Sequence, residues 1–233
     1  MVQWVRHGRI ASHRGDIPLT EEGRQEAVDA GRRLARTFAG AEIVHFLTTA
    51  TRRSAQSATA MRDGAAEQLD AIGRQDVELC TPMEEPAIRN PDLFLAGRRV
   101  EMVSTPEAMA EQLGGTGLGP EQVRAIPFYP EFFVHRDRIG FWVAHPTPPG
   151  ENADAVARRL MAFALSLLDL PIERPRRYVC VTHSPLMRAF LHRYLMDDDP
   201  GEPNFMESVD LLIGQDRSVV VRYRDRERTV ITN

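Results

Sequence analysis

The sequence predicts an α/β fold: a three-layer α/β/α sandwich with a mostly parallel central sheet and an inserted lid or cap segment. First, apolar strand-like runs alternate with helical stretches along most of the chain. Second, residues 178–182 form a continuous apolar run, which is typical of a strand buried on both faces in a parallel sheet. Third, the length of 233 residues fits a single domain over residues 1–233.

The N-terminal part of the chain contains two predicted strand–helix units. Residues 2–6 are apolar and form the first strand. Thr20 then precedes a helical stretch over 21–38, with acidic residues in its first turn and arginines toward its end, as the helix dipole favours. Residues 41–47 form the second strand, and a helix over about 51–68 follows.

A long segment follows the third strand, which is predicted at 76–80. From about 84 to 150 the sequence has no regular pattern, is rich in proline and glycine, and carries many of the aromatic residues. Insertions of this length in a compact domain are usually functional lids or binding loops. We therefore expect an inserted cap over about 86–149. The alternative is a decoration that its aromatic side chains pack onto the sheet.

The C-terminal part continues the alternation of helices and strands. A helix with an apolar face covers 150–169, the buried strand 178–182 comes next, and a second helix covers about 185–195. Two runs at 208–213 and 218–223 flank a short turn sequence and predict a terminal hairpin.

The composition excludes several classes of function. The chain has no lysine, so its 29 basic residues are all arginine, and P-loop or Schiff-base chemistry is excluded. The net charge of −4 argues against nucleic acid or an anionic membrane as a partner. No run approaches a membrane span of about 20 apolar residues, and the short N-terminal strand does not resemble a signal peptide. Cys80 and Cys180 lie in apolar runs and indicate reduced core residues of a cytoplasmic protein.

The most informative local pattern is a strand that ends in Arg6-His7-Gly8. Arg6 offers a planar fork of donors that suits phosphate oxygens. The imidazole of His7 can act as a nucleophile near neutral pH. Gly8 allows a sharp turn and the close approach of a substrate. Alone, the triplet fits a strand end with a structural histidine better than a catalytic site, so distant parts of the chain must supply further support.

Two other strand ends carry suitable residues. The second strand leads into a helix start that contains hydroxyl groups, Arg52 and Arg53, and helix N-termini bind anions well. The strand at 178–182 ends in His183. Because ligands of α/β folds bind at the carboxyl edge of the sheet, we expect these groups to lie near His7.

An acidic pair, Glu84-Glu85, follows the third strand and is expected at the same edge. A carboxyl group that is shielded from water and close to a second acid keeps its proton to higher pH. One of these residues could then protonate a leaving group. An exposed acidic loop explains the pair equally well.

Together these motifs resemble the histidine phosphatase superfamily, in the branch that also contains the cofactor-dependent phosphoglycerate mutases. The matches occur in the same order at both ends of the chain and leave out about 90–145. The resemblance selects Arg53 over Arg52. The matching segments are Arg6-His7-Gly8, Leu19-Thr20-Glu21-Glu22-Gly23, Arg53 with Gln56-Ser57-Ala58, Pro149-Gly150-Glu151, and Val181-Thr182-His183-Ser184 with Arg188.

The resemblance implies a role for each matching residue. His7 would attack the phosphorus atom and become phosphohistidine. Arg6, Arg53 and His183 would bind the phosphoryl oxygens, where charge develops in the transition state, and His183 would belong to the catalytic group. His13 stands where the superfamily often has asparagine, and it could also donate to a phosphate oxygen.

The resemblance also implies the proton donor and the partners. Glu85 would protonate the leaving group and then activate water, with Glu84 as its rival and Glu151 as a more distant alternative. No metal ion or other cofactor is expected, because the cationic side chains would balance the charge of the phosphate. The expected substrate is a small-molecule phosphomonoester, and the sequence leaves open whether the protein forms a homodimer.

Three functions fit these observations: a phosphatase, a mutase-type phosphotransferase, and a catalytically idle phosphate-binding module. A mutase must shield a doubly phosphorylated intermediate from water, and the segment 90–145 does not resemble a mutase lid, which favours hydrolysis. The presence of both histidines and both arginines argues against the idle module. The departures from the superfamily pattern are Ile10, His13, Thr49-Ala50, Glu26 and Ser184, and none of them replaces a central residue.

Overall fold

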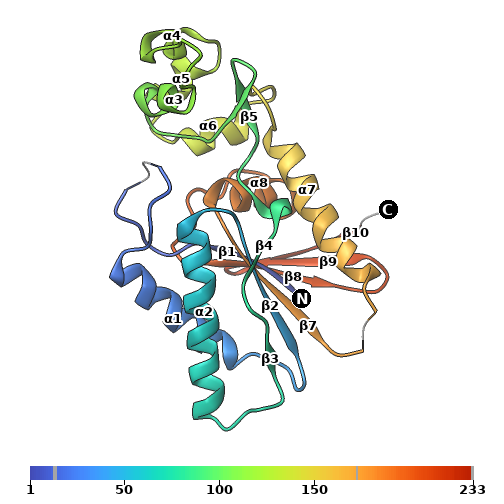
Figure 1. The fold of residues 1–233 in the computed structure, drawn as a ribbon. Coiled ribbons are helices and arrows are strands. Elements are labelled where there is room, and N and C mark those ends of the chain that lie inside the picture. Colours follow the sequence, from blue (N-terminus) through green and yellow to red (C-terminus); the bar gives the residue numbers. More distant parts are fainter. Residues whose placement is uncertain (13–14, 172, 232–233) are drawn as a thin grey trace.

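An eight-stranded mixed sheet runs through the centre of the computed structural model, which describes residues 1–12, 15–171 and 173–231 (Figure 1). Within these residues the strand order is β10-β9-β8-β1-β7-β2-β3, and β4 also pairs with β2. The strands of this sheet are β1 (Val2–Arg6), β2 (Ile43–Thr48), β3 (Glu78–Leu79), β4 (Met83–Glu84), β7 (Arg176–Thr182), β8 (Ser208–Ile213), β9 (Ser218–Tyr223) and β10 (Arg226–Ile231).

Strand β7 lies at the centre of the parallel part of the sheet. It pairs in parallel with β1 on one side and with β2 on the other, and β2 also pairs in parallel with β3 and β4. On the far side of β1, strands β8, β9 and β10 continue the sheet with antiparallel pairing. The predicted mostly parallel central sheet is confirmed, with an antiparallel extension that includes the predicted hairpin.

Helices cover both faces of the sheet (Figure 1). Successive residues of a strand point to opposite faces. Trp4 accordingly belongs to the apolar cluster of α7 and α8, whereas Val5 belongs to that of α1 and α2. The three-layer α/β/α sandwich is therefore confirmed. These helices are α1 (Glu21–Ala35), α2 (Arg52–Ala71), α7 (Ala153–Ser166) with the short η2 (Leu167–Asp169), and α8 (Ser184–Tyr194).

Side-chain caps explain where two of these helices begin. The Oγ1 of Thr20 accepts a hydrogen bond from Gly23 N (3.0 Å) at the start of α1. The Oδ1 of Asn152 accepts one from Ala155 N (2.9 Å) at the start of α7. Helix α1 ends at Ala35, somewhat before the predicted end. Among the described helices, none is both long and apolar enough to cross a bilayer.

The third predicted strand differs from the structure. Only Glu78–Leu79 form β3, and Met83–Glu84 form β4 farther along the same side of β2. Both cysteines are free; Cys180 is buried as predicted, but Cys80 is only half-buried, because it lies beside the edge strand of the sheet. Strand β10 is missed by the sequence pattern, since most of its side chains are charged and exposed.

Residues 86–149, termed the cap from here on, form short regular elements rather than the irregular segment that the sequence suggested. Prolines lie in the first turn of α3, α4 and α5, where the missing N–H costs no hydrogen bond, so a proline-rich sequence can form helices here. The elements are η1 (Pro86–Ile88), β5 (Leu93–Leu95), β6 (Arg98–Val100), α3 (Pro106–Gln112), α4 (Pro120–Ala125), α5 (Tyr129–Val134) and α6 (Arg138–Ala144).

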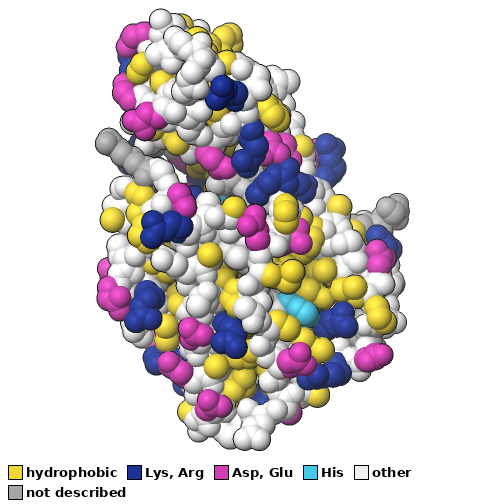
Figure 2. All heavy atoms as spheres, in the orientation of Figure 1, with side chains coloured by type: hydrophobic (Ala, Val, Ile, Leu, Met, Phe, Trp, Pro, Cys, Tyr) yellow, Lys and Arg dark blue, Asp and Glu magenta, His cyan; other side chains and the backbone are white. Residues whose placement is uncertain are grey.

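The cap lies over the edge at which β2, β4 and β7 end (Figure 1), and the molecule narrows where the cap meets the rest of the chain (Figure 2). Its aromatic side chains form an interior of their own: Tyr129, Phe132 and Trp142 are buried, and the Phe128 and Phe132 rings stack 5.3 Å apart. This interior is continuous with the cluster of α7 and α8. The cap aromatics therefore serve mainly as packing.

Candidate active site

Two histidines lie side by side where neighbouring parallel strands end. Arg6 of β1 is opposite Thr182 of β7 in the register, and His7 N donates to Thr182 O (3.0 Å). The next residue along each strand is a histidine, so the ring centroids of His7 and His183 are only 5.3 Å apart. Both histidines are buried. The structure thus brings together the two strand-end histidines that the sequence singled out.

A hydrogen bond orients the ring of His7. Its Nδ1 lies 2.8 Å from Gly8 O, which can only accept, so Nδ1 carries the proton of the neutral ring and Nε2 carries the lone pair. Gly8 N in turn donates to Ser57 Oγ (2.9 Å) on α2. A Cβ at Gly8 would lie 2.7 Å from Gly23 O, so the turn has no space for a side chain. In the neutral form of this ring, Nε2 is therefore the nitrogen that carries a lone pair and can act as a nucleophile.

The guanidinium of Arg6 is held by residues close to the C-terminal hairpin. Its Nη2 lies 2.7 Å from Glu202 Oε1, and its Nη1 donates to Pro203 O. Its Cζ is 4.1 Å from the centre of the Phe205 ring, a cation–π contact. Burial lowers the pKa of Arg6, while Glu202 acts in the opposite direction. An anion that binds Arg6 must therefore share or displace the Glu202 carboxylate.

Arg53 comes from the first turn of α2, directly after β2. Burial lowers its pKa, and the carboxyl groups of Asp16 and Glu101 act in the opposite direction. Its Nε is buried and has no hydrogen-bond partner within the described residues. An unsatisfied donor at a helix N-terminus favours the binding of an anion. The neighbouring Arg52 is exposed.

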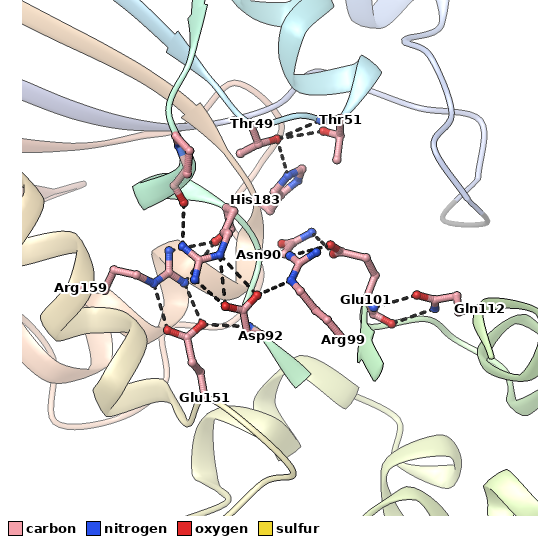
Figure 3. A network of polar contacts seen from close by, with 12 residues as sticks. Thr49, Thr51, Asn90, Asp92, Arg99, Glu101, Gln112, Glu151, Arg159 and His183 are labelled. Carbon is pink, nitrogen blue, oxygen red and sulfur yellow. Dashed lines mark hydrogen bonds and ion pairs between the residues drawn. The ribbon is translucent and has the colours of Figure 1, made fainter. Parts of the chain in front are cut away.

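His183 is a buried neutral imidazole. Burial lowers its pKa well below the ordinary value for histidine, and the nearby positive charge of Arg53 acts in the same direction. Its Nε2 lies 3.1 Å from Thr49 Oγ1, at the end of β2 (Figure 3). Its Nδ1 is buried and has no hydrogen-bond partner in the described part of the chain. His183 therefore has a ring nitrogen that remains available for a ligand.

The buried neutral state of His183 predicts a loss of stability in acid. In the unfolded chain the imidazole of His183 takes up a proton at about pH 6.5, whereas in the folded chain it does so only at lower pH. The free energy of unfolding should therefore fall as the pH drops below about 6.5. Thermal unfolding from mildly alkaline to mildly acidic pH measures this slope. His183→Gln should flatten it, and His135→Gln, at an exposed position, should not. Equal slopes for His183→Gln and the parent protein would contradict the prediction.

Two adjoining hollows open between the sheet edge and the cap. The inner hollow, of about 410 Å³, is lined by both histidines, by Arg6 and by Arg53. The outer hollow, of about 990 Å³, adjoins it, because Arg53, Asn90, Met102 and Val103 line both. The inner hollow is further lined by Ser104, Phe132, Arg136, Asp137, Arg138, Ile139, Ser184, Pro185 and Glu202.

Glu85, the predicted proton donor, lies at the same sheet edge but lines neither hollow. It follows β4 directly, and β4 places Glu84 level with Thr48 of β2. The Oε1 of Glu85 accepts a hydrogen bond from Ala87 N (2.8 Å), at the start of η1. Glu85 is half-buried and Glu84 is exposed. Glu85 is therefore the better shielded of the two acids, and its role as donor stays a prediction.

Glu151, the more distant alternative for the proton donor, lines neither hollow. Glu151 accepts hydrogen bonds from Arg159 Nε (3.0 Å) and Asp92 N (2.8 Å) and so links the cap to α7 (Figure 3). His13 lies outside the described residues. In the part of the chain that is described, no group of three or more histidine, cysteine or acidic side chains is placed to hold a metal ion.

The N-terminal third of the chain matches a known family. Residues 1–76 match the sequence model of the histidine phosphatase superfamily (branch 1), and this stretch contains Arg6, His7 and Arg53. Sequence similarity to this superfamily is thus shown for residues 1–76 of the chain. No curated protein matches it in sequence.

Solved structures match the fold along nearly the whole chain. A mycobacterial glucosyl-3-phosphoglycerate phosphatase in complex with VO3 has a TM-score of 0.52 at 18% identity and covers 100% of this chain and 98% of its own. A phosphoglycerate mutase from Bacillus anthracis has a TM-score of 0.53 at 15% identity, with coverage of 99% and 91%. A phosphoserine phosphatase variant from Entamoeba histolytica, in complex with phosphoserine, has a TM-score of 0.51 at 14% identity, with coverage of 94% and 93%. At these identities the likeness establishes the fold.

The superfamily motifs include Arg188 but do not reveal its partners. Arg188 is fully buried, and its guanidinium pairs with Asp137 of the cap (2.6 Å), with Asp199, and with Glu202 (3.5 Å). Glu202 also accepts a hydrogen bond from Ser184 Oγ (2.6 Å). These acids come from segments far apart in sequence, so no local pattern marks them. They connect the cap to the part of the site that carries the second histidine.

Glu202→Gln is expected to strengthen the binding of inorganic phosphate. The Glu202 carboxylate forms an ion pair with the Arg6 guanidinium and repels an incoming anion. A glutamine at this position can still accept a hydrogen bond from Ser184 Oγ. Because the Glu202 side chain is 48% exposed and screened by water, the inhibition constant of phosphate should fall only about threefold to tenfold. Isothermal titration or inhibition of turnover measures this constant. Glu227→Gln, at a surface ion pair with Arg222, is the control, and an unchanged constant for Glu202→Gln would contradict the prediction.

Proposed function

We propose that this protein is a member of the histidine phosphatase superfamily and a phosphomonoester hydrolase, which acts on a small phosphorylated metabolite through a phosphohistidine intermediate, without a metal ion. One observation carries the proposal: His7 and His183 lie with Arg6 and Arg53 around a single hollow at the carboxyl edge of the sheet. This arrangement combines a nucleophile with groups that bind phosphoryl oxygens.

The reaction has two steps. In the first, His7 Nε2 attacks phosphorus, the P–N bond forms as the P–O bond to the alcohol breaks, and Glu85 gives its proton to the leaving oxygen. In the second, Glu85 accepts a proton from water, the water oxygen attacks phosphorus, and the P–N bond breaks to release phosphate and neutral His7. The backbone carbonyl of Gly8 holds the proton of Nδ1 throughout, so the ring keeps the tautomer that the reaction needs.

The remaining groups bind the three non-bridging oxygens. Arg6 and Arg53 each carry a positive charge, and His183 contributes a neutral imidazole nitrogen without a protein partner in the described residues. Positive charge in a partly water-excluded hollow stabilises the transition state more than it would in water. This supply of positive charge supports a reaction without a metal ion.

Hydrolysis is favoured over mutase chemistry. The outer hollow beside Arg53 is lined by several carboxyl groups, which would repel the second phosphoryl group of a bisphosphorylated intermediate. Two of the fold relatives described above are phosphatases by name. If 2,3-bisphosphoglycerate loads His7 and 3-phosphoglycerate is isomerised rather than hydrolysed, the protein is a mutase.

The direct test is turnover of p-nitrophenyl phosphate by the purified protein in the presence of a chelator. We expect steady release of p-nitrophenol together with inorganic phosphate, unchanged when the chelator is added. An absence of turnover with this and a panel of phosphorylated metabolites, together with tight phosphate binding, would identify an idle binding module instead. Activity that the chelator abolishes would contradict the metal-free mechanism.

Glu85→Gln is expected to slow substrates with poor leaving groups more than p-nitrophenyl phosphate. An alkyl alcohol needs a proton as it leaves, whereas p-nitrophenolate is already stable, so the loss should be about 10²–10⁴-fold for an alkyl phosphate and much smaller for the aryl ester. Comparison of kcat for the two substrates measures the difference. Glu84→Gln is the matched control at the adjacent exposed acid. Equal slowing of both substrates by Glu85→Gln would place the donor elsewhere.

A further inference from the structure

The outer hollow is the space into which the alcohol part of a substrate can extend. It adjoins the inner hollow at Arg53, Asn90 and Met102, so a phosphoryl group bound beside His7 has direct access to it. Its volume of about 990 Å³ exceeds the 410 Å³ of the inner hollow. A group as large as a sugar can therefore fit there. The residues that line it should select the alcohol.

Among the described lining residues, acidic side chains outnumber basic ones in the outer hollow, whereas basic side chains outnumber acidic ones in the inner hollow. Four carboxyl side chains line it, and Arg53, at its boundary, is the single basic side chain among its described lining residues. Two of these acids, Asp16 and Glu101, act to raise the pKa of Arg53. They therefore lie close enough to interact with the residue that lines both hollows. The carboxyl residues are Asp16, Glu101, Glu107 and Glu111.

Glu101 is fixed in position by its neighbours (Figure 3). Its Oε2 accepts a hydrogen bond from Asn90 Nδ2 (3.0 Å), and its Oε1 pairs with Arg99 (3.0 Å). The side chain of Gln112 clamps its backbone on both sides, accepting from Glu101 N (2.8 Å) and donating to Glu101 O (3.1 Å). Asn90 itself has a buried Oδ1 without a partner in the described residues. This wall of the hollow is therefore built of polar groups with unused acceptor capacity.

Glu111 on α3 lines the same hollow. Its carboxylate forms no ion pair with any of the residues described by the structure, unlike that of Glu121 on α4, which pairs with Arg124 (3.3 Å). A hollow with acceptors and negative charge binds an ammonium group and repels a carboxylate or a second phosphate. A neutral hydroxyl group should bind there more weakly than an ammonium group and more strongly than a carboxylate.

We propose that the alcohol released by this enzyme carries a cationic amine, which Glu101 and Glu111 bind in the outer hollow. The inference rests on the proposed phosphatase function and adds the class of substrate, an amino alcohol or amino sugar phosphate. It also assigns opposite tasks to the two hollows: the arginines of the inner one bind the phosphoryl group, and the acids of the outer one bind the amine.

The test compares three phosphomonoesters of nearly equal size: glucosamine 6-phosphate, glucose 6-phosphate and 6-phosphogluconate. Glucosamine 6-phosphate and glucose 6-phosphate differ only in the ammonium or hydroxyl group at C2, and 6-phosphogluconate is an open-chain compound of the same carbon number with a carboxylate at C1. We expect kcat/KM to be about tenfold higher for the amine than for the hydroxyl compound, and lowest for the carboxylate. The preference should shrink as salt is added, because the attracting charges are screened.

Variants identify the residues responsible. The double variant Glu101→Gln with Glu111→Gln should reduce the ratio of the amine to the hydroxyl substrate to about unity, and Glu121→Gln, the paired acid on the neighbouring helix, should leave it unchanged. Circular dichroism and thermal unfolding check that the double variant is folded, and Glu111→Gln alone provides a milder change. Expressing selectivity as a ratio removes any general effect on turnover.

The outcomes separate this inference from the function on which it rests. Turnover of p-nitrophenyl phosphate without a preference for the amine, or with a preference that survives in the double variant, would overturn the inference and leave the phosphatase intact. A preference for 6-phosphogluconate would assign the alcohol to Arg136 and Arg138 of the inner hollow instead and would also overturn it. Absence of any phosphatase activity would overturn both.

Discussion

His7→Ala is expected to lower the rate of p-nitrophenyl phosphate hydrolysis by a factor on the order of 10⁴ or more, because the proposed nucleophile is lost. The Nδ1 of His7 is bound to Gly8 O, so the attack must come from Nε2, and no hydroxyl or thiol group is proposed to replace it. The rate is measured at saturating substrate. The same samples, stopped in alkali to preserve a P–N bond, should show one added phosphoryl group in the parent protein and none in the variant.

The control for this prediction is His192→Ala. His192 lies in the last turn of α8, whereas the reacting groups lie at the opposite end of that helix, so its loss should leave the rate close to that of the parent. Residual activity of His7→Ala near the parent level would refute the proposed mechanism. Loss of activity without loss of the phosphorylated species would instead move the nucleophile to another residue.

Arg53→Ala is expected to reduce kcat/KM by about 10²–10³-fold, because a positive charge next to the phosphoryl group is removed. Its unsatisfied buried Nε and its position at the start of α2 indicate that the guanidinium is placed for an anion rather than for a structural partner. Arg53→Lys should recover only part of the loss, since an ammonium group lacks the planar fork of donors. The effect should appear equally with all phosphomonoesters, because every substrate shares the phosphoryl group.

Arg52→Ala provides the matched control for Arg53. The two arginines are adjacent in the first turn of α2, but the side chain of Arg52 is exposed and lines neither hollow. We expect activity within about twofold of the parent, as for most surface substitutions. If the two variants have equal effects, charge at the helix start matters in general, and the specific role of Arg53 is contradicted.

The elements that the sequence predicts best are those with strong local patterns. The strands at 2–6, 208–213 and 218–223 occur with the predicted bounds, because alternating or continuous apolar residues leave little choice of conformation. The start of α1 also follows from a local cap at Thr20. The order of the parallel strands, in contrast, depends on contacts between segments far apart in the chain.

The helices of the cap, in contrast, are not predicted from the sequence. These helices are short, α3, α4 and α5 contain a proline in the first turn, and their apolar residues form an interior with one another and with α7 and α8, so no helical period is visible in the sequence. Strand β10 escapes prediction for a related reason: it pairs with β9 through its backbone while most of its side chains are exposed. Both depend on packing that a local pattern does not encode.

By itself the sequence determined which reactive groups lie at the strand ends: a histidine at the end of each of two buried strands, arginines in place of lysines, and an acidic pair after a third strand. The tertiary structure alone decided which groups meet. It paired Glu202 with Arg6, placed Glu101 and Glu111 in the outer hollow that Arg53 also lines, and left Glu85 outside both hollows. The physical reason is that strand ends follow from local backbone preferences. The charge and size of a hollow instead depend on side chains from distant segments that only the packed chain brings together.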